Sequence, residues 1–234
     1  MGKKLFREID LFLFDMDGLL FDTETIYINY GKKIAEEMGY IFDVHFIEQS
    51  TGATNEAFRK MCLEKFGEDF DFDIYCHRVE SYIREQADNG NIPLMPGAKE
   101  ILEYLRENNK KMVLATSAGI EMARKLTESK NIKEYFSHMI TSEHVKKGKP
   151  DPEVFLKGAE KTGVNPEKAM VFEDSFNGIR AAHAAGMYPV MIPDKLKPND
   201  EIKKLYYKEF KSLKEVIRYF ENEIVPGGWA VSNL

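Results

Sequence analysis

The chain has 234 residues, of which 43% are hydrophobic and 31% are charged, and its net charge of −6 at pH 7 comes without a long basic cluster. This composition is typical of a globular protein with one large core, or a core and a smaller domain, and it argues against nucleic acid as a partner. No apolar stretch reaches the ~18 residues that a membrane span needs, and no signal peptide is recognisable. Cys62 and Cys76 are isolated, which is typical of a reducing compartment. We therefore expect a cytoplasmic protein that does not bind membranes, and we expect it to be a monomer.

The first predicted strand is an apolar run, Leu11–Phe14, that ends abruptly at Asp15-Met-Asp17-Gly18. A run without alternation indicates a strand buried on both faces. In open α/β sheets ligands bind at the carboxyl ends of the strands. Two neighbouring carboxylates there repel each other and need a cation or a catalytic task, although a polar turn explains this motif alone equally well. Gly18 is expected to adopt a positive φ.

The interval that follows contains helical patterns and no convincing strand, with helices predicted at residues 24–38, 55–66 and 73–86. It is too long for an ordinary crossover, whose loops have ~2–6 residues. We therefore predict an inserted all-helical domain at residues 22–92, and a core domain formed by residues 1–21 and 93–234. The connections at residues 21–23 and 89–97 are the candidate hinges. Four aromatic residues should form the core of the insert: Phe58, Phe66, Phe70 and Phe72.

From residue 110 onward strands and helices alternate along the chain. Strands are predicted at residues 111–115, 138–141, 169–172 and 188–192, and helices at residues 120–129, 152–162, 178–185 and 213–222. Such alternation predicts an α/β fold with a doubly wound parallel sheet and right-handed crossovers. For the C-terminal tail, which holds Trp229, the sequence suggests no role.

Three further polar motifs lie near the ends of these strands: Thr116-Ser117, the run Lys146–Lys149, and Glu173-Asp174. Each is weak alone, since a Thr-Ser pair is often a helix N-cap and a lysine run is often a solvated turn. In their order and spacing with the first motif, however, they resemble the haloacid dehalogenase superfamily from Leu11 to about Pro193. That resemblance implies a Rossmann-like core, and the insert is similar to the small helical cap of its β-phosphoglucomutase-like phosphatases.

The family resemblance extends to several phrases that look like pseudouridine-5′-phosphatase-type members: residues 14–24, Leu94-Met-Pro-Gly97 and residues 171–174. It implies that Asp15 is the nucleophile, which splits hydrolysis into formation and breakdown of an aspartyl phosphate. Asp17 would be the general acid and base. Three groups would bind the phosphoryl oxygens: the Thr116 hydroxyl, the Ser117 amide and the Lys149 ammonium.

The same resemblance implies a Mg²⁺ cofactor, a hard cation that takes oxygen ligands and keeps several waters. Its ligands would be the carboxylates of Asp15 and Asp174 and the backbone carbonyl of Asp17. Glu173 would bind the metal through water or lie behind the ligands. The alternative interpretation is that Glu173 is an acid exposed to solvent with no role in the site. The implied activity is that of a Mg²⁺-dependent phosphatase, a phosphoric monoester hydrolase that acts on a small phosphomonoester such as a sugar phosphate or a nucleoside monophosphate.

Two positions in the insert bear on the alternative of a phosphosugar mutase. The β-phosphoglucomutases have a histidine in the cap, shortly after the first motif, and this chain has Tyr27 at that position. They also have an arginine three residues after a glycine of the substrate-specificity loop. If that glycine is aligned on Gly52, this chain has Asn55 in place of the arginine. Both differences favour hydrolysis. We expect Tyr27, Gly52 and Asn55 to contact the substrate, and the insert to close over it as a lid. A catalytically silent binding protein is a second alternative, although no catalytic group of the family is missing.

Overall fold

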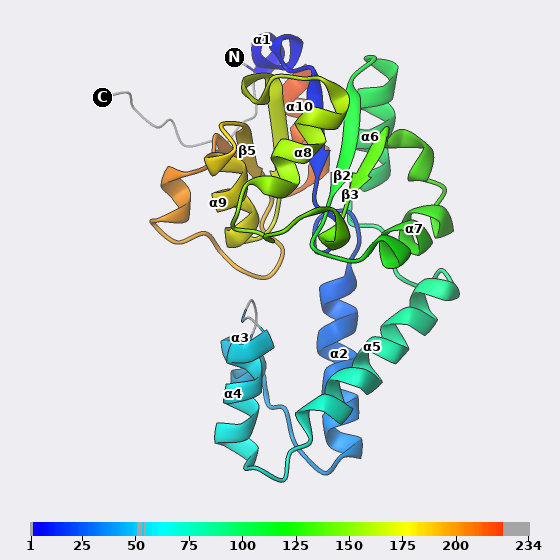
Figure 1. Ribbon diagram of the computed structural model, residues 1–234, viewed down its shortest axis with the longest axis vertical. Helices are drawn as coiled ribbons and strands as arrows, with labels where there is room; N and C mark the ends of the chain where they lie inside the picture. Colours follow the sequence, from blue (N-terminus) through cyan, green and yellow to red (C-terminus); the bar gives the residue numbers. More distant parts are fainter. Residues whose placement is uncertain (1, 51–52, 54, 222–234) are drawn as a thin grey trace.

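The computed structural model describes residues 2–50, 53 and 55–221, and in this part of the chain its centre is one parallel sheet (Figure 1). The strand order is β3-β2-β1-β4-β5-β6, and every pairing is parallel. The strands are β1 (Leu11–Phe14), β2 (Lys111–Ala115), β3 (His138–Ile140), β4 (Ala169–Glu173), β5 (Tyr188–Met191) and β6 (Lys208–Glu209). The predicted α/β fold with a doubly wound parallel sheet is confirmed, and only the short β6 was not predicted.

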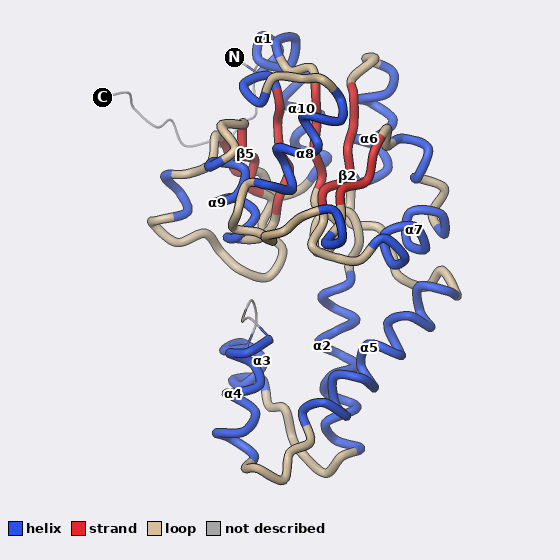
Figure 2. The backbone as a smooth tube through the Cα atoms, in the orientation of Figure 1, coloured by secondary structure: helices blue, strands red, loops and turns tan. Residues whose placement is uncertain are grey.

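Helices cover both faces of the sheet, as the tube view shows (Figure 2). The helices of the sheet layer are α1 (Gly2–Glu8), α6 (Ala98–Glu107), α7 (Ile120–Ser129), α8 (Glu153–Thr162), α9 (Phe176–Ala184) and α10 (Leu213–Glu221). Successive β1 side chains point to opposite faces: Phe12 and Phe14 join the core under α1, α6 and α10, while Leu11 and Leu13 join the core under α8 and α9. This is why all four residues of β1 are fully buried and apolar.

A helical insertion follows β1 and extends away from the carboxyl end of the sheet (Figure 1). Its helices are α2 (Thr23–Glu37), α3 (Val44–Ser50), α4 (Asn55–Phe66) and α5 (Phe72–Asp88). Phe70 and Phe72 are buried, and Phe58 and Phe66 pack partly buried against the same cluster. The prediction that these aromatic rings form the core of the insertion is confirmed. In the described part of the chain, no helix is both long and apolar enough to cross a membrane.

Two short connections join the insertion to the sheet layer, and they run side by side. Phe21 and Leu94 form an antiparallel bridge. Asp22 N donates to Pro93 O at 3.0 Å, and Met95 N donates to Leu20 O at 2.9 Å. Both predicted hinge segments therefore meet at one place, beneath the carboxyl end of β1.

The sequence patterns missed α1, α3 and α6. Helix α6 carries a clear apolar stripe of Ala98, Ile101, Leu102 and Leu105, all fully buried. Its start is set by Gly97, which adopts a φ of 92° at the N-cap. The sequence pattern places Gly97 at the end of the connection at residues 89–97, although glycine also occurs at helix N-caps. The other predicted elements agree with the structure to within two residues at each end.

Candidate active site

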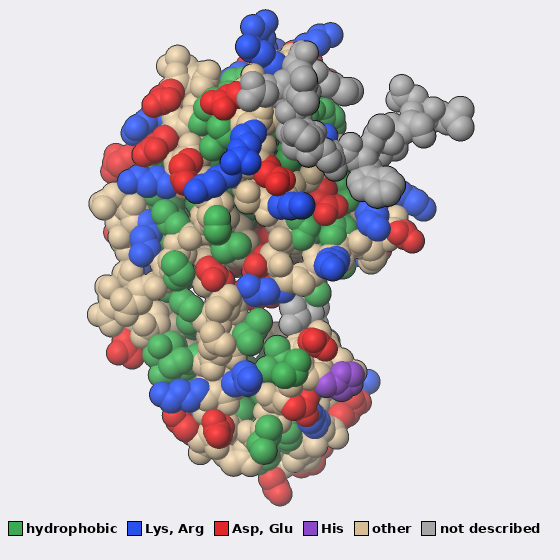
Figure 3. Space-filling model, turned by 180° about the vertical axis from the view of Figure 1, so that it is seen from behind, with side chains coloured by type: hydrophobic (Ala, Val, Ile, Leu, Met, Phe, Trp, Pro, Cys, Tyr) green, Lys and Arg blue, Asp and Glu red, His purple; other side chains and the backbone are tan. Residues whose placement is uncertain are grey.

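The four polar motifs come together at the carboxyl edge of the sheet. Asp15, Asp17, Thr116, Lys149 and Asp174 all line one cavity of about 760 Å³. The opposite wall of this cavity belongs to the helical insertion, and the space-filling view shows the hollow between the two parts of the molecule (Figure 3). The sheet topology explains the convergence, because parallel strands present their carboxyl ends at the same edge.

Lys149 is buried at the centre of the cluster, with a side chain that is only 6% exposed. Its Nζ donates to Asp15 Oδ1, to Glu173 Oε1 at 2.6 Å and to the Ala115 carbonyl oxygen at 3.0 Å. Burial lowers the pKa of Lys149, but the charges and hydrogen bonds of Asp15 and Glu173 outweigh it, so the pKa is raised. The ammonium group therefore stays charged and offsets part of the negative charge of both carboxylates.

Glu173 lies behind the cavity wall and is fully buried. One carboxylate oxygen accepts from Lys149, and the other accepts from the backbone N and the hydroxyl of Ser175 at 3.0 and 2.9 Å. Gly178 leaves the space for this carboxylate, since a Cβ there would lie 1.8 Å from Glu173 Cδ. The Glu173 side chain is therefore not a solvated acid, and its hydrogen bonds hold Lys149 and the start of α9 in place.

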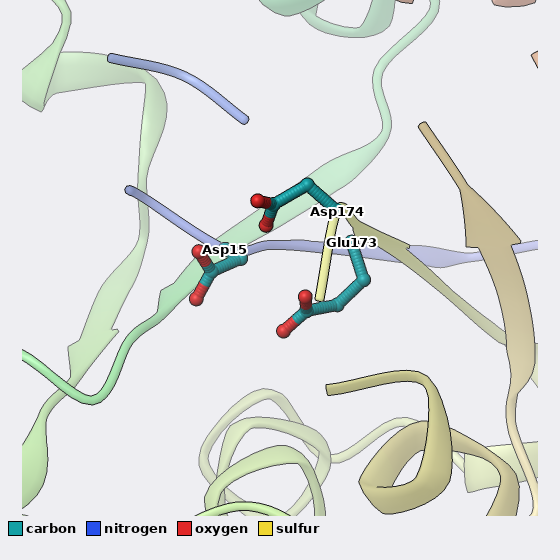
Figure 4. Close-up of side chains that lie close together, drawn as sticks. All are labelled: Asp15, Glu173 and Asp174. Carbon is teal, nitrogen blue, oxygen red and sulfur yellow. The ribbon is translucent and has the colours of Figure 1, made fainter. Parts of the chain in front are cut away.

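A metal site is suggested by three carboxylates, Asp15, Glu173 and Asp174, whose nearest oxygens all lie within 4.8 Å of one another (Figure 4). Asp174 Oδ1 is buried and has no hydrogen-bond partner among the described residues. Burial raises the pKa of Asp174 well above its usual value, and the charges of Glu173 and Asp15 raise it further. A buried, unpartnered carboxylate beside two others fits a hard divalent cation with oxygen ligands. Because the oxygens of Glu173 are occupied, Asp174 is the better direct ligand.

The remaining acid, Asp17, is held from the first turn of α2. Thr23 Oγ1 donates to Asp17 Oδ1 at 2.8 Å. Burial raises the pKa of Asp17, while the hydrogen bond from Thr23 and the charge of Lys149 lower it. The net effect raises the pKa of Asp17, which favours a proton on this carboxyl group, as a general acid needs. The pKa of Asp15 is likewise raised, to about 7. Burial raises it most, the charge of Lys149 lowers it, and the charges of Glu173 and Asp17 raise it further.

Thr116 and Ser117 follow β2 and precede α7, but neither is the N-cap of that helix, which is Gly119. Thr116 is buried, and its Oγ1 accepts from Ala118 N at 3.0 Å. Since a hydroxyl both donates and accepts, the Thr116 proton stays available to an oxygen in the cavity. Ser117 is exposed beside it.

On the insertion side, Tyr27 and Asn55 line the cavity, and Tyr27 is 44% exposed. Partial burial, with the charges of Asp17 and Glu80, raises the pKa of Tyr27 to about 12, so the phenol remains a hydrogen-bond donor. Gly52, which we expected to contact the substrate, lies outside the described residues.

The cavity also has charged lining residues that the sequence patterns did not single out, among them Glu24, Arg180 and Lys195. Glu24 lies in the first turn of α2 and is the last residue of the phrase at residues 14–24 that resembles the family. Lys195 follows β5, and its place just after a predicted strand of a parallel sheet could have indicated it. Arg180 gave no comparable signal, because a charged side chain on a helix is ordinary.

Gly18 permits the close approach of Asp174, and this predicts the effect of a substitution. Gly18 and Gly39 both have positive φ values, 79° and 88°, so alanine at either position should cost about 1–2 kcal/mol. A Cβ at Gly18 would also lie 2.3 Å from Asp174 Oδ2, whereas one at Gly39 meets nothing within 4 Å. We expect urea denaturation to give a larger loss of unfolding free energy for Gly18→Ala than for Gly39→Ala. Equal losses would show that Asp174 moves aside freely.

Comparison with known proteins gives consistent matches over most of the chain. The sequence model of the haloacid dehalogenase-like hydrolases matches residues 12–192. The chain is 35% identical over 205 residues to a "Probable pseudouridine-5′-phosphatase" of Drosophila melanogaster, covering 83% of this chain and 86% of that protein. It is 33% identical over 177 residues to a phosphorylated carbohydrates phosphatase of Thermotoga maritima, covering 75% and 81%. A β-phosphoglucomutase structure from Clostridium difficile superposes with a TM-score of 0.69 at 25% identity, covering 92% of this chain and 98% of that one.

Proposed function

The chain belongs to the haloacid dehalogenase-like hydrolase family, and on that premise we propose that it is a Mg²⁺-dependent phosphatase acting through an aspartyl phosphate on Asp15. Phosphatase activity on small phosphorylated compounds is common to its named relatives. The observation that best supports the finer proposal is the contact of Lys149 with both Asp15 and Glu173 inside the cavity. A buried cation there offsets the charge of the nucleophile and of an incoming phosphate together.

The proposed reaction begins with phosphate bound by Lys149, the Thr116 hydroxyl and the Ser117 amide. An oxygen of Asp15 then attacks phosphorus, the bond from phosphorus to the substrate oxygen breaks, and Asp17 gives its proton to the departing alcohol. In the second step Asp17 takes a proton from water as that water attacks phosphorus. The bond between phosphorus and Asp15 breaks, which releases inorganic phosphate and restores the carboxylate.

The proposed metal ligands are the carboxylates of Asp15 and Asp174 and the backbone carbonyl of Asp17, with Glu173 behind them. Mg²⁺ bound there would offset the negative charge that the phosphate and the carboxylates share. The unpartnered Asp174 Oδ1 supports this assignment. Asp174 would keep its orientation because Gly18 packs against it.

We further propose that residues 22–92 form a separate domain, a lid over the core domain of residues 1–21 and 93–234. The paired connections at Phe21 and Leu94 support this boundary, since two adjacent connecting segments can act as a single hinge. The lid would place Tyr27, Asn55 and the Gly52 loop over the phosphate. Hydroxyl and amide groups suit the hydroxyls of a sugar or a nucleoside better than a second phosphate, so we propose a sugar phosphate or a nucleoside monophosphate as substrate.

The second candidate is a phosphosugar mutase, favoured by the structural likeness to a β-phosphoglucomutase. Against it stands Tyr27, whose neutral phenol cannot act as an imidazole would near neutral pH. Asn55 likewise offers no cation for a second phosphate. A binding protein without catalysis is less well supported, because each catalytic group lines or borders the same cavity.

The test is phosphate release from p-nitrophenyl phosphate and from a panel of sugar phosphates and nucleoside monophosphates with Mg²⁺. We expect the wild type to hydrolyse several of these compounds. Asn55→Ala should lower kcat/KM about tenfold or more for the best natural compound, while kcat/KM for p-nitrophenyl phosphate should stay within about twofold of the wild type. In a coupled assay, glucose 1-phosphate with a bisphosphate activator should yield little glucose 6-phosphate. Mutase turnover above the rate of phosphate release would favour the second candidate, and no turnover of any compound would favour the binding protein.

A further inference from the structure

Besides the two connections and the ion pairs between α5 and α7, another polar contact joins the sheet layer to the helical insertion. It is made by the loop that follows β5, through Asp194 and Lys195. Lys195 Nζ donates to Thr25 Oγ1 at 3.0 Å, across 170 positions of sequence, and to Asp194 Oδ1 at 3.0 Å. It also lies 4.0 Å from Asp22 Oδ1, and its side chain is 31% exposed. Asp22 and Thr25 both belong to the beginning of α2.

Asp194 has a side chain that is 9% exposed, and its Oδ2 is buried with no hydrogen-bond partner of its own among the described residues. Glu24, from the first turn of α2, faces it. The pKa of Glu24 is raised to about 7, mainly by burial and by the hydrogen bond and charge of Asp194. The charge of Lys195 lowers this pKa, and the charge of Asp22 raises it. Glu24 therefore lies against Asp194, beside the contact that Lys195 makes with Thr25.

The same turn of α2 holds the proposed general acid. Thr23 is buried and donates to Asp17 Oδ1 at 2.8 Å. This turn therefore contacts Asp17 through Thr23, and it contacts the β5 loop through Thr25. Helix α2 continues from this turn to Tyr27 on the cavity wall. A displacement of the turn would move both the partner of Asp17 and one wall of the cavity.

We propose that Asp194 and Lys195 are positioning residues that hold the first turn of α2, so that Thr23 orients Asp17 and Tyr27 stays on the cavity wall. This inference rests on the proposed role of Asp17 in the phosphatase reaction. Lys195 acts through Thr25 and Asp194, because its ammonium group is occupied by them. The contact is exposed to water, so its effect should be on geometry and local opening more than on global stability.

The test compares three lysine variants in the full chain. Lys195→Met removes the cation but keeps the length of the side chain, Lys195→Arg keeps both, and Lys197→Met is the control. Lys197 lies on the same loop, is exposed, and forms no ion pair within the described residues. The first measurement is amide hydrogen exchange of residues 20–32 without substrate or metal. We expect exchange to become at least about fivefold faster in Lys195→Met only, a loss of about 1 kcal/mol in local opening.

The second measurement is steady-state hydrolysis of p-nitrophenyl phosphate. Lys195→Met should lower kcat about three- to tenfold with KM within twofold, and Lys195→Arg should recover most of both signals. Unchanged exchange in Lys195→Met, or unchanged kcat, would overturn the proposal. A rise in KM with normal exchange would also overturn it, since Lys195 would then contact the substrate. If the wild type released no phosphate, the proposed function would fail, while the exchange result would still decide whether the loop holds α2.

Discussion

Asp15→Asn should reduce phosphate release by about 10³-fold or more, because an amide is isosteric with the carboxylate but does not attack phosphorus. The measurement is phosphate release from p-nitrophenyl phosphate with saturating Mg²⁺. The matched control is Asp10→Asn, the same change immediately before β1, where the side chain is half exposed and lies 3.4 Å from Lys168 Nζ. This control should keep full activity.

The folded state of Asp15→Asn should be at least as stable as the wild type in the absence of metal. Asp15 is one of three crowded carboxylates, and its pKa of about 7 means that the fold disfavours its charged form relative to the unfolded chain. The cost of its ionised form therefore grows as the pH rises from about 4 to about 7 and is complete above pH 7. The neutral amide removes that cost, while Lys149 keeps Glu173 as a partner. Thermal unfolding checks this expectation. More than a few per cent of wild-type activity in a folded Asp15→Asn protein would place the nucleophile elsewhere.

Chelation of divalent cations should silence the wild type, and Mg²⁺ should restore it. Asp174→Asn should stay inactive at every Mg²⁺ concentration, because the neutral amide leaves Asp15 without a second carboxylate for the cation. Ca²⁺ should inhibit, since it prefers longer bonds and more ligands than a near-octahedral phosphoryl-transfer site provides. Asp200→Asn is the control, because Asp200 is almost fully exposed and pairs only with Lys203 in the described part of the chain.

Metal binding to this site also predicts a signal that does not depend on turnover. Mg²⁺ at 100 times its dissociation constant should stabilise the wild type by about 2.7 kcal/mol, and it should stabilise Asp200→Asn equally. Asp174→Asn should show no such stabilisation. Full activity in the presence of a chelator, or equal stabilisation of Asp174→Asn by Mg²⁺, would contradict the metal assignment.

Local patterns predicted β1 and the position of the acids behind it because the signal is contiguous: four apolar residues buried on both faces, then two acids and a glycine at the strand end. The positive φ of Gly18 was predicted for the same reason. The patterns failed for α1, α3 and α6, because no element was assigned to residues 2–8, 44–50 and 98–107. These omissions concern single helices rather than the fold class.

The sequence by itself determined the parallel α/β fold, the helical insertion and the order of the four polar motifs, because apolar periodicity and residue type are properties of neighbouring positions. Only the tertiary structure decided that Glu173 is a fully buried partner of Lys149 and that Asp174 has an oxygen without a partner among the described residues. It also decided that the two connections of the insertion pair through Phe21 and Leu94. It alone also brought Lys195 to Thr25, across 170 positions. Burial and hydrogen bonding depend on which distant segments the sheet order makes neighbours, and no local pattern encodes that order.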